Sequence, residues 1–331
     1  MSLPDYQKLI GSQMRAFIKK SQALYPSNTT DQTINDQRVL YEKLCLAFNH
    51  GRPAGVKSHD DLVQHIPVRY YLFDGAVAEL NAKVSKDQME QPLIVYFHGG
   101  GFVLGGLESH DDICSEICAK TGYGLVSVDY RLAPEHPHPA MFNDALQATR
   151  YLIKNTDFPL ILCGDSSGGN LAAAVAHSLR YETERIIGQL LIYPSLRPTT
   201  GRGSYKKHAM APMLTTSDVK FFIRSRCGQP TGCLPDDKTL FPLLDNNFCN
   251  LPPTVIMTAD CDPLRDDGRD YRAQITAAGG KVLWVNEEGL VHGFLRARKE
   301  VQCASLAFVR MIDLILMLGK NNWVLGKSKI F

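Results

Sequence analysis

One serine in the chain stands in a setting that favours nucleophilic chemistry. Ser166 lies in the hexapeptide GDSSGG at 164–169, directly after an apolar run at 160–163 and directly before an alanine-rich run. This order predicts a strand, a sharp turn and a helix, which would present the serine hydroxyl above the strand end. The glycines keep side chains out of the turn, and the first N–H groups of the helix would face an oxyanion. We therefore predict Ser166 as a nucleophile, and Asp165 as a local hydrogen-bonding residue rather than a catalytic one.

A second glycine-rich motif follows another predicted strand. The apolar run at 93–97 is followed by the pentapeptide HGGGF at 98–102. Three consecutive glycines cost backbone entropy and need a local reason, either a simple tight turn or a close approach of the backbone to a substrate. In the second case their N–H groups, with that of the residue after the nucleophile, would stabilise a developing negative charge. The predicted oxyanion hole is built from four residues: Gly99, Gly100, Gly101 and Ser167.

The general base and its orienting acid are expected later in the chain, in the order serine, acid, histidine. Of ten histidines, His292 alone lies late, beyond the predicted strand 281–285 and before the last helical stretch. Four aspartates follow the predicted strand 254–258: Asp260, Asp262, Asp266 and Asp267. Asp266 and Asp267 look like first-turn helix residues, where acids suit the helix dipole. Position alone therefore favours either Asp260 or Asp262.

Two other interpretations of these residues are disfavoured. The hexapeptide also resembles that of chymotrypsin-like proteases, but in those two-barrel proteins the serine comes last of the three catalytic groups. A metal site could be sought among four side chains: His98, His110, Asp111 and Asp112. Their spacing matches no ligand signature, and the run HDD at 110–112 suits the start of a helix. We therefore predict no metal site and no cofactor.

The elements that must position these residues alternate along the chain. Strands are predicted over 68–73, 93–97, 124–128, 160–163, 188–193, 254–258 and 281–285. Helices are predicted over 110–120, 139–154, 169–181 and 267–278. This alternation is typical of right-handed βαβ units around a mainly parallel sheet, so the fold class is α/β. Residues 197–250 break the rhythm with prolines and glycines, which predicts an insertion over the edge of the sheet.

The two ends of the chain lie outside this alternation. Residues 1–60 contain two helical patterns, around 10–18 and 36–48, and the second ends in the breaker run NHGRP. From composition alone, a packed N-terminal extension is favoured over a lid. The residues from 319 to 331 have no period and are expected to form a loosely held tail.

Composition and charge exclude several classes of protein. Among 331 residues there are 36 Lys and Arg against 34 Asp and Glu, which leaves no basic excess for nucleic acid or for an anionic membrane. The hydrophobic share of 44% is that of a globular protein. Charged residues interrupt the longest apolar stretch, 304–318, and the N-terminus lacks the apolar core of a secretory signal. Nine cysteines without paired spacing favour free thiols, so we expect a cytoplasmic protein.

Taken together, the motifs resemble the hormone-sensitive-lipase family of α/β-hydrolases, and within it the bacterial acetyl esterases. The resemblance covers about residues 65–318. It rests on five blocks in family order: HGGGF at 98–102, DYRLAPE at 129–135, GDSSGG at 164–169, DPLRD at 262–266 and HGF at 292–294.

The resemblance implies a serine carboxylesterase that hydrolyses short-chain acyl esters, with Ser166 as nucleophile, Asp262 as the acid and His292 as the base. It implies that Gly100, Gly101 and Ser167 donate to the oxyanion while Gly99 shapes the loop. The family usually has alanine where Ser167 stands, a mild change for a backbone donor. The resemblance also reverses the preference stated above for residues 1–60, because it favours a cap over a packed N-terminal extension.

In domain terms, the resemblance implies that residues 1–60 and 197–225 form a cap over a catalytic domain at 61–318, followed by the tail 319–331. The implied partner is a small-molecule ester, and a homodimer or a regulatory protein partner would leave no mark in the sequence. The alternative hypothesis is a binding or regulatory protein on a hydrolase fold. His292 is present, so no loss of the base is visible, and such a role could coexist with esterase activity because surface helices outside the site remain free to bind partners.

Overall fold

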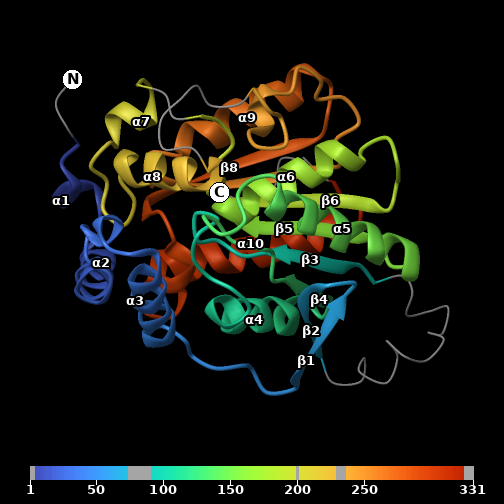
Figure 1. The fold of residues 1–331 in the computed structure, drawn as a ribbon, viewed down its shortest axis with the longest axis horizontal. Helices are drawn as coiled ribbons and strands as arrows, with labels where there is room; N and C mark the ends of the chain where they lie inside the picture. Colours follow the sequence, from blue (N-terminus) through green and yellow to red (C-terminus); the bar gives the residue numbers. More distant parts are fainter. Residues whose placement is uncertain (1–3, 74–90, 199–200, 229–235, 324–331) are drawn as a thin grey trace.

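A single mixed sheet forms the centre of the computed structural model, which describes residues 4–73, 91–198, 201–228 and 236–323. The strands are β1 (Val56–Val63), β2 (Ile66–Phe73), β3 (Leu93–Phe97), β4 (Gly124–Val128), β5 (Leu160–Asp165), β6 (Ile186–Ile192), β7 (Thr254–Cys261) and β8 (Val282–Val291). Their order across the sheet is β1-β2-β4-β3-β5-β6-β7-β8 (Figure 1). The pairs β1–β2 and β2–β4 are antiparallel and the other neighbouring pairs are parallel. The predicted α/β class with a mainly parallel sheet is confirmed.

Helices cover both faces of the sheet. One face packs against α4 (Asp111–Thr121) and α10 (Gln302–Gly319), and the other against α5 (Ala140–Asn155), α6 (Ser167–Leu179) and α9 (Arg265–Ala277). Side chains of β3 alternate between these two layers: Ile94 and Tyr96 join the first, and their neighbours Val95 and Phe97 join the second. Because both layers are buried, the central strands are apolar along their whole length.

Two further groups of helices lie together at one side of the sheet (Figure 1). The N-terminal group is α1 (Tyr6–Leu9), α2 (Ser12–Leu24) and α3 (Ile34–Ala47), and the inserted group is α7 (Ser204–Lys207) and α8 (Thr216–Cys227). Short 3-10 segments are η1 (Thr29–Asp31), η2 (Glu108–His110), η3 (Pro242–Leu244) and η4 (Phe294–Lys299). The insertion expected over 197–250 therefore contains helices of its own.

Several elements differ in extent from those expected; β7, for example, continues to Cys261 instead of ending at 258. Strand β1 was not predicted. The helical part of the N-terminal segment ends at Ala47, and β1 then crosses the expected boundary at residue 60 between the N-terminal segment and the catalytic domain. β1 is an edge strand in which five of the eight residues are exposed and only one is buried, so no alternating apolar pattern reveals it. β8 continues to Val291 instead of ending at 285, so it leads directly into His292.

Helix α10 explains the longest apolar stretch of the sequence. By length and composition it is the one helix in the described residues that could cross a membrane. It packs instead on β5, β6, β8 and α4, and buries side chains such as Phe308, Met311 and Ile315 in the core. Its hydrophobicity is therefore that of a core helix. α10 ends at Gly319, and residues 324–331 of the expected tail lie outside the described residues.

Close packing of α6 against β3 depends on glycine. A Cβ atom added to Gly168, in the first turn of α6, would overlap the backbone carbonyl of Phe97 at the end of β3. A Cβ atom on Gly164 would in turn overlap the backbone of Gly168. The sharp turn between β5 and α6 therefore fits against its neighbouring strand only without side chains at these positions.

Replacing Gly168 with alanine should lower the free energy of unfolding by about 1–3 kcal/mol, as expected for an overpacked interior. Gly201 is the matched control, because it is exposed and nothing lies within 4 Å of the position where its Cβ would stand. Gly201→Ala should change the free energy of unfolding by less than about 0.5 kcal/mol. Urea unfolding of both variants measures the difference, and equal stabilities would contradict the packing argument.

His98, the first residue after β3, is buried and neutral. Its Nδ1 donates to the carbonyl oxygen of Gly99 (2.8 Å), and its ring stacks on Tyr130 with 4.3 Å between ring centroids. The Tyr130 hydroxyl donates to the His98 carbonyl oxygen (2.6 Å). Burial, together with the nearby ring of His110, lowers the pKa of His98 from 6.5 to about 4. Protonation of His98 therefore opposes folding.

This shift predicts a loss of stability in mild acid. The unfolded chain takes up a proton at His98 near pH 6.5 and the folded chain only near pH 4, so this stability is complete above pH 6.5 and declines as the pH falls toward 4. The contribution of His98 to the free energy of unfolding should decline by about 2 kcal/mol between pH 7.5 and pH 5. In His98→Asn, whose amide can still donate to Gly99, the pH dependence measured by urea unfolding should be weaker by that amount. An unchanged pH dependence would assign the acid sensitivity to other groups.

Candidate active site

Ser166 occupies the turn between β5 and α6 in a conformation uncommon for a residue with a side chain. Its φ is 54° and its ψ is −114°. Its backbone N–H donates to the carbonyl oxygen of Ile192 (2.8 Å), which fixes the turn against the end of β6. The hydroxyl oxygen lies 2.9 Å from Nε2 of His292. Backbone strain of this kind persists where surrounding contacts hold it, and it is concentrated at functional sites.

His292 and Asp262 follow two neighbouring parallel strands. Asp262 comes directly after β7 and His292 directly after β8, so their side chains meet at the same edge of the sheet. Nδ1 of His292 donates to Oδ2 of Asp262 at 2.7 Å, and the other carboxylate oxygen accepts the N–H of Leu264 at 2.8 Å. The Asp262 side chain is fully buried. With its proton held on Nδ1, the imidazole offers Nε2 to accept the hydroxyl proton of Ser166.

The other three candidate acids make different contacts. Asp260 lies within β7 and faces Arg265 at 3.5 Å. Asp266 and Asp267 stand in the first turn of α9, as the sequence indicates, and accept backbone N–H groups from residues 196–204. Of the four aspartates, only Asp262 bonds to His292.

The acidic residues weighed as metal ligands are engaged in ion pairs. Asp111 accepts a hydrogen bond from Arg69 at 2.9 Å, and Asp112 accepts one from Arg298 at 2.6 Å. In the part of the chain that the structure describes, no three His, Cys, Asp or Glu side chains are grouped as a metal site requires. The arginine guanidinium stays protonated, so the negative charges of these carboxylates are already balanced by their ion pairs.

The glycine loop and the first turn of α6 supply backbone donors beside Ser166. Among the described residues, no acceptor is found for the N–H groups of Gly100, Gly101 and Ser167, and all three residues line the cavity that contains Ser166. Gly100 and Gly101 have φ of 130° and 63°, values that favour glycine. Gly99 differs, because its N–H donates to Asp165 (2.9 Å). Gly99 is thus committed to the shape of the loop.

Asp165 holds the glycine loop and the serine turn together. Its Oδ1 accepts the Tyr96 hydroxyl (2.8 Å) and the Gly99 N–H (2.9 Å), and it lies 3.3 Å from Nε2 of His110. Burial alone would raise the pKa of this carboxyl, but His110 and the hydrogen bond from Tyr96 hold it well below its usual range. Asp165 thus has the hydrogen-bonding role that the sequence predicts.

A buried arginine beneath the loop was not foreseen. Arg226, at the end of α8, places its guanidinium carbon 3.6 Å from the ring centroid of Phe102, which has a φ of 66°. Nη1 donates to the carbonyl oxygen of Leu240 (2.9 Å), while Nε and Nη2 have no partner within the described residues. Burial lowers the pKa of Arg226 to about 9. Stacking of this kind fixes Phe102, and no local sequence pattern signals it.

Two further side chains reach the loop from outside the motifs. Arg38 of α3 donates to the carbonyl oxygen of Val103 (2.9 Å) and pairs with Glu135 (2.7 Å). Phe222 of α8 covers Gly101 so closely that a Cβ atom there would lie 2.5 Å from its ring. Both contacts join segments distant in sequence, so spacing and periodicity gave no signal for them.

The cavity above Ser166 has a volume of about 140 Å³. Besides the residues already described, the N-terminal helices contribute Tyr41 and Leu44 to its walls, and the inserted segment contributes Met213 and Phe222. Tyr193 closes one side, with its ring centroid 4.7 Å from that of His292. A small and mostly apolar chamber with a few convergent polar groups is typical of a small-molecule site.

Sequence comparison finds esterases of similar sequence. The chain is 40% identical to the esterase LipI of Mycobacterium tuberculosis over 216 residues, which cover 63% of this chain and 67% of that protein. It is 35% identical to the carboxylesterase NlhH of the same species, over 75% of this chain and 76% of that protein. It is also 31% identical to an ethyl acetate hydrolase of Pseudomonas putida, over 66% of this chain and 71% of that protein.

Structural comparison leads to the same family. An ester hydrolase, EH1AB1, from the metagenome of Lake Arreo superposes with a TM-score of 0.81 at 28% identity, covering 94% of this chain and 99% of that one. An esterase of the bacterial hormone-sensitive lipase family shares the fold, with a TM-score of 0.80 at 23% identity over 93% of this chain and 98% of that one. Residues 94–296 match the family described as the alpha/beta hydrolase fold. The chain therefore belongs to the α/β-hydrolases, as its motifs predict, and the relatives of similar sequence are esterases.

Proposed function

We propose that this protein is a serine carboxylesterase that hydrolyses short-chain acyl esters through an acyl-enzyme intermediate. The observation that carries the proposal is the hydrogen-bonded chain from the Ser166 hydroxyl through His292 to the buried carboxylate of Asp262, at 2.9 and 2.7 Å. The esterases and the carboxylesterase among its relatives support the reaction class.

In the proposed acylation step, Oγ of Ser166 attacks the ester carbonyl carbon while Nε2 of His292 takes the hydroxyl proton. Asp262 stabilises the imidazolium that forms and keeps the ring oriented. The proton on Nε2 then passes to the alcohol oxygen as the C–O bond breaks. Deacylation repeats the sequence with water as the nucleophile, and releases the carboxylic acid.

Negative charge develops on the carbonyl oxygen in both steps. We assign its stabilisation to the N–H groups of Gly100, Gly101 and Ser167, because they are uncommitted and line the cavity beside the nucleophile. A preorganised donor of this kind is worth roughly 10²–10³ in rate. Gly99 contributes indirectly, through its bond to Asp165.

Two finer points of the proposal concern the substrate and the cap. A chamber of about 140 Å³ suits a small acyl group, and one relative is an ethyl acetate hydrolase. We also infer that the N-terminal helices and the segment 197–225 act as a cap, since both contribute walls to the chamber. The eight described cysteines are free, which supports the cytoplasm as the compartment.

Removing the nucleophile tests the proposal directly. Ser166→Ala should lower kcat for p-nitrophenyl acetate by at least about 10⁴-fold while the urea unfolding midpoint stays close to that of the wild type. The adjacent Ser167 is the matched control: its hydroxyl is buried without a partner in the described residues, and its proposed contribution is the backbone N–H. Ser167→Ala should therefore retain activity within a few fold. Turnover by pure Ser166→Ala at the wild-type rate would overturn the assignment.

Chamber size generates a second expectation. Along a series of p-nitrophenyl esters from acetate to decanoate, kcat/KM should be highest for the shortest acyl chains and fall as the chain exceeds the chamber. Initial rates at matched subsaturating concentrations give the profile. A maximum at octanoate or decanoate would contradict the short-chain preference and leave the serine mechanism standing.

A further inference from the structure

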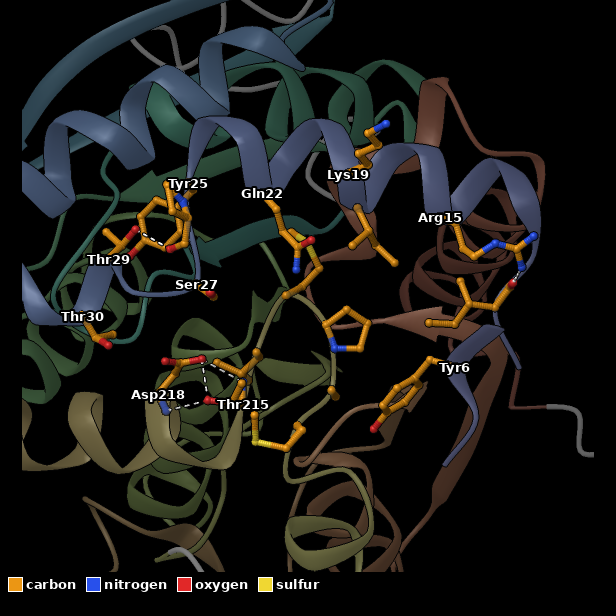
Figure 2. A pocket seen from close by; sticks show the side chains of 18 of the residues that line it. Tyr6, Arg15, Lys19, Gln22, Tyr25, Ser27, Thr29, Thr30, Thr215 and Asp218 are labelled. Carbon is orange, nitrogen blue, oxygen red and sulfur yellow. Dashed lines mark hydrogen bonds between the residues drawn. The ribbon is translucent and has the colours of Figure 1, made fainter. Parts of the chain in front are cut away.

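A second and larger cavity lies beside the catalytic chamber. It has a volume of about 620 Å³ and lies between the N-terminal helices α1 and α2 and the inserted segment around residues 210–222 (Figure 2). Four residues line both cavities: Tyr25, Met213, Leu214 and Phe222. We call the larger cavity the outer groove. The two cavities are therefore neighbours that have these four side chains in common.

The outer groove has one polar and one apolar wall. Helix α2 presents the residues at 15, 18, 19 and 22, a spacing that places them on one face, and the loop 210–214 opposite them is largely apolar. Gln22 points its amide into the groove (Figure 2). The hydroxyl-bearing side chains of Ser27 and Thr30 also line it.

Two polar groups in the outer groove have hydrogen-bonding capacity to spare. The Tyr25 hydroxyl is buried and has no partner among the described residues. Burial, and the charge of Asp218, raise the pKa of Tyr25 well above its usual value, so the hydroxyl keeps its proton and remains a donor. Oδ2 of Asp218 accepts the Thr215 hydroxyl (2.7 Å) and N–H (2.8 Å), whereas its Oδ1 accepts no hydrogen bond from the described residues. A buried polar group without a partner is costly, so the Tyr25 hydroxyl marks a place where a ligand bonds, and the partly buried Asp218 offers an acceptor near it.

The basic side chains of the outer groove are poorly placed to bind an anion. Arg15 donates to the carbonyl oxygens of Gln7 and Ile10, and so caps the end of α1. Lys19 is exposed and extends away from the centre of the groove (Figure 2). What remains is two amides, hydroxyls and one carboxylate, together with the aromatic rings of Tyr6, Tyr25 and Phe222. This set suits neutral hydroxyl groups, each of which both donates and accepts, on a ring with an apolar face.

We propose that the outer groove binds the alcohol part of the ester, and that this alcohol is a polyhydroxylated ring of sugar size. The inference rests on the proposed esterase function and specifies its substrate class. Ser166 Oγ forms a bond to the acyl carbon, the bond from that carbon to the ester oxygen of the polyol breaks, and His292 gives the proton it took from Ser166 to that oxygen, which becomes a hydroxyl group. The free polyol leaves through the groove, and water releases the short carboxylic acid from the acyl-enzyme.

The opposite orientation, with a long acyl chain in the outer groove, is disfavoured by the same groups. An alkyl chain packed along α2 would take water away from Gln22 and Asp218, would leave the Tyr25 hydroxyl without a partner, and would give none of the three a hydrogen bond. The volumes point the same way: about 140 Å³ for the chamber is small, whereas about 620 Å³ falls within the range of sites that hold a whole small molecule.

The test compares two acetate esters of primary alcohols, ethyl acetate and methyl 6-O-acetyl-glucopyranoside. The wild-type kcat/KM should be at least about tenfold higher for the glucoside, because its ring hydroxyls form two to three hydrogen bonds in the groove that ethyl acetate cannot form. In Gln22→Leu and in Tyr25→Phe, the ratio of the two kcat/KM values should fall at least about fivefold, mainly through KM for the glucoside. Gln147→Leu, an exposed glutamine of helix α5 away from both cavities, is the matched control and should leave the ratio unchanged.

Binding without turnover separates this inference from the proposed function. In the Ser166→Ala background, calorimetry should show the acetylated glucoside binding, and Gln22→Leu weakening that binding at least about fivefold. An unchanged ratio and unchanged binding in both groove variants would overturn the inference, even if the protein hydrolyses p-nitrophenyl acetate. Faster turnover of p-nitrophenyl decanoate in Gln22→Leu than in the wild type would overturn it too, because it would place the acyl chain in the groove.

Binding of the glucoside without hydrolysis of any ester would uphold the subsite and refute the esterase proposal. Should Gln22→Leu fail to fold, Tyr25→Phe carries the test, since it removes a single oxygen atom.

Discussion

The arrangement of the site depends on one buried carboxylate. A charged group in the interior is tolerated only where hydrogen bonds replace its hydration, and Asp165 gains them from the Tyr96 hydroxyl, the Gly99 N–H and the His110 ring. These partners come from β3, from the loop that follows it and from η2. Asp165 immediately precedes Ser166, so satisfying its charge also sets the distance between the serine turn and the glycine loop. The candidate nucleophile and the candidate oxyanion donors are thereby placed by the same group.

The helices outside the sheet are joined to this arrangement and are more than a cover. Arg38 of α3 and Arg226 of α8 contact the glycine loop from the N-terminal and the inserted segment respectively. Arg226 in particular is buried and forms no ion pair with a carboxylate of the described residues; its guanidinium stacks on the ring of Phe102 and donates to a carbonyl oxygen. The position of the loop thus depends on both segments being docked. A displacement of either would reach the donors of Gly100 and Gly101 before it reached Ser166 or His292.

Much of the fold and of the triad could be predicted from the sequence because its signals are local. Strands buried on both faces read as continuous apolar runs, and the parallel arrangement brings Ser166, Asp262 and His292 to one edge of the sheet. Spacing alone did not separate Asp260 from Asp262, because the end of β7 at Cys261 falls between them, and the resemblance to a family was needed. The edge strand β1 escaped notice because most of its side chains are exposed.

What the sequence could not reveal were contacts between distant segments. The stacking of Arg226 on Phe102 and the unpartnered hydroxyl of Tyr25 depend on tertiary packing, which no periodicity encodes. Different segments therefore hold different parts of the site. The candidate reacting groups lie at the ends of strands, and side chains from α3 and α8 contact the glycine loop beside them. No hydrogen bond found in the described residues joins the groove-facing side chain of Gln22 in α2 to that loop. Residues on this face of α2 can therefore change which alcohol is accepted without moving the atoms that perform the chemistry.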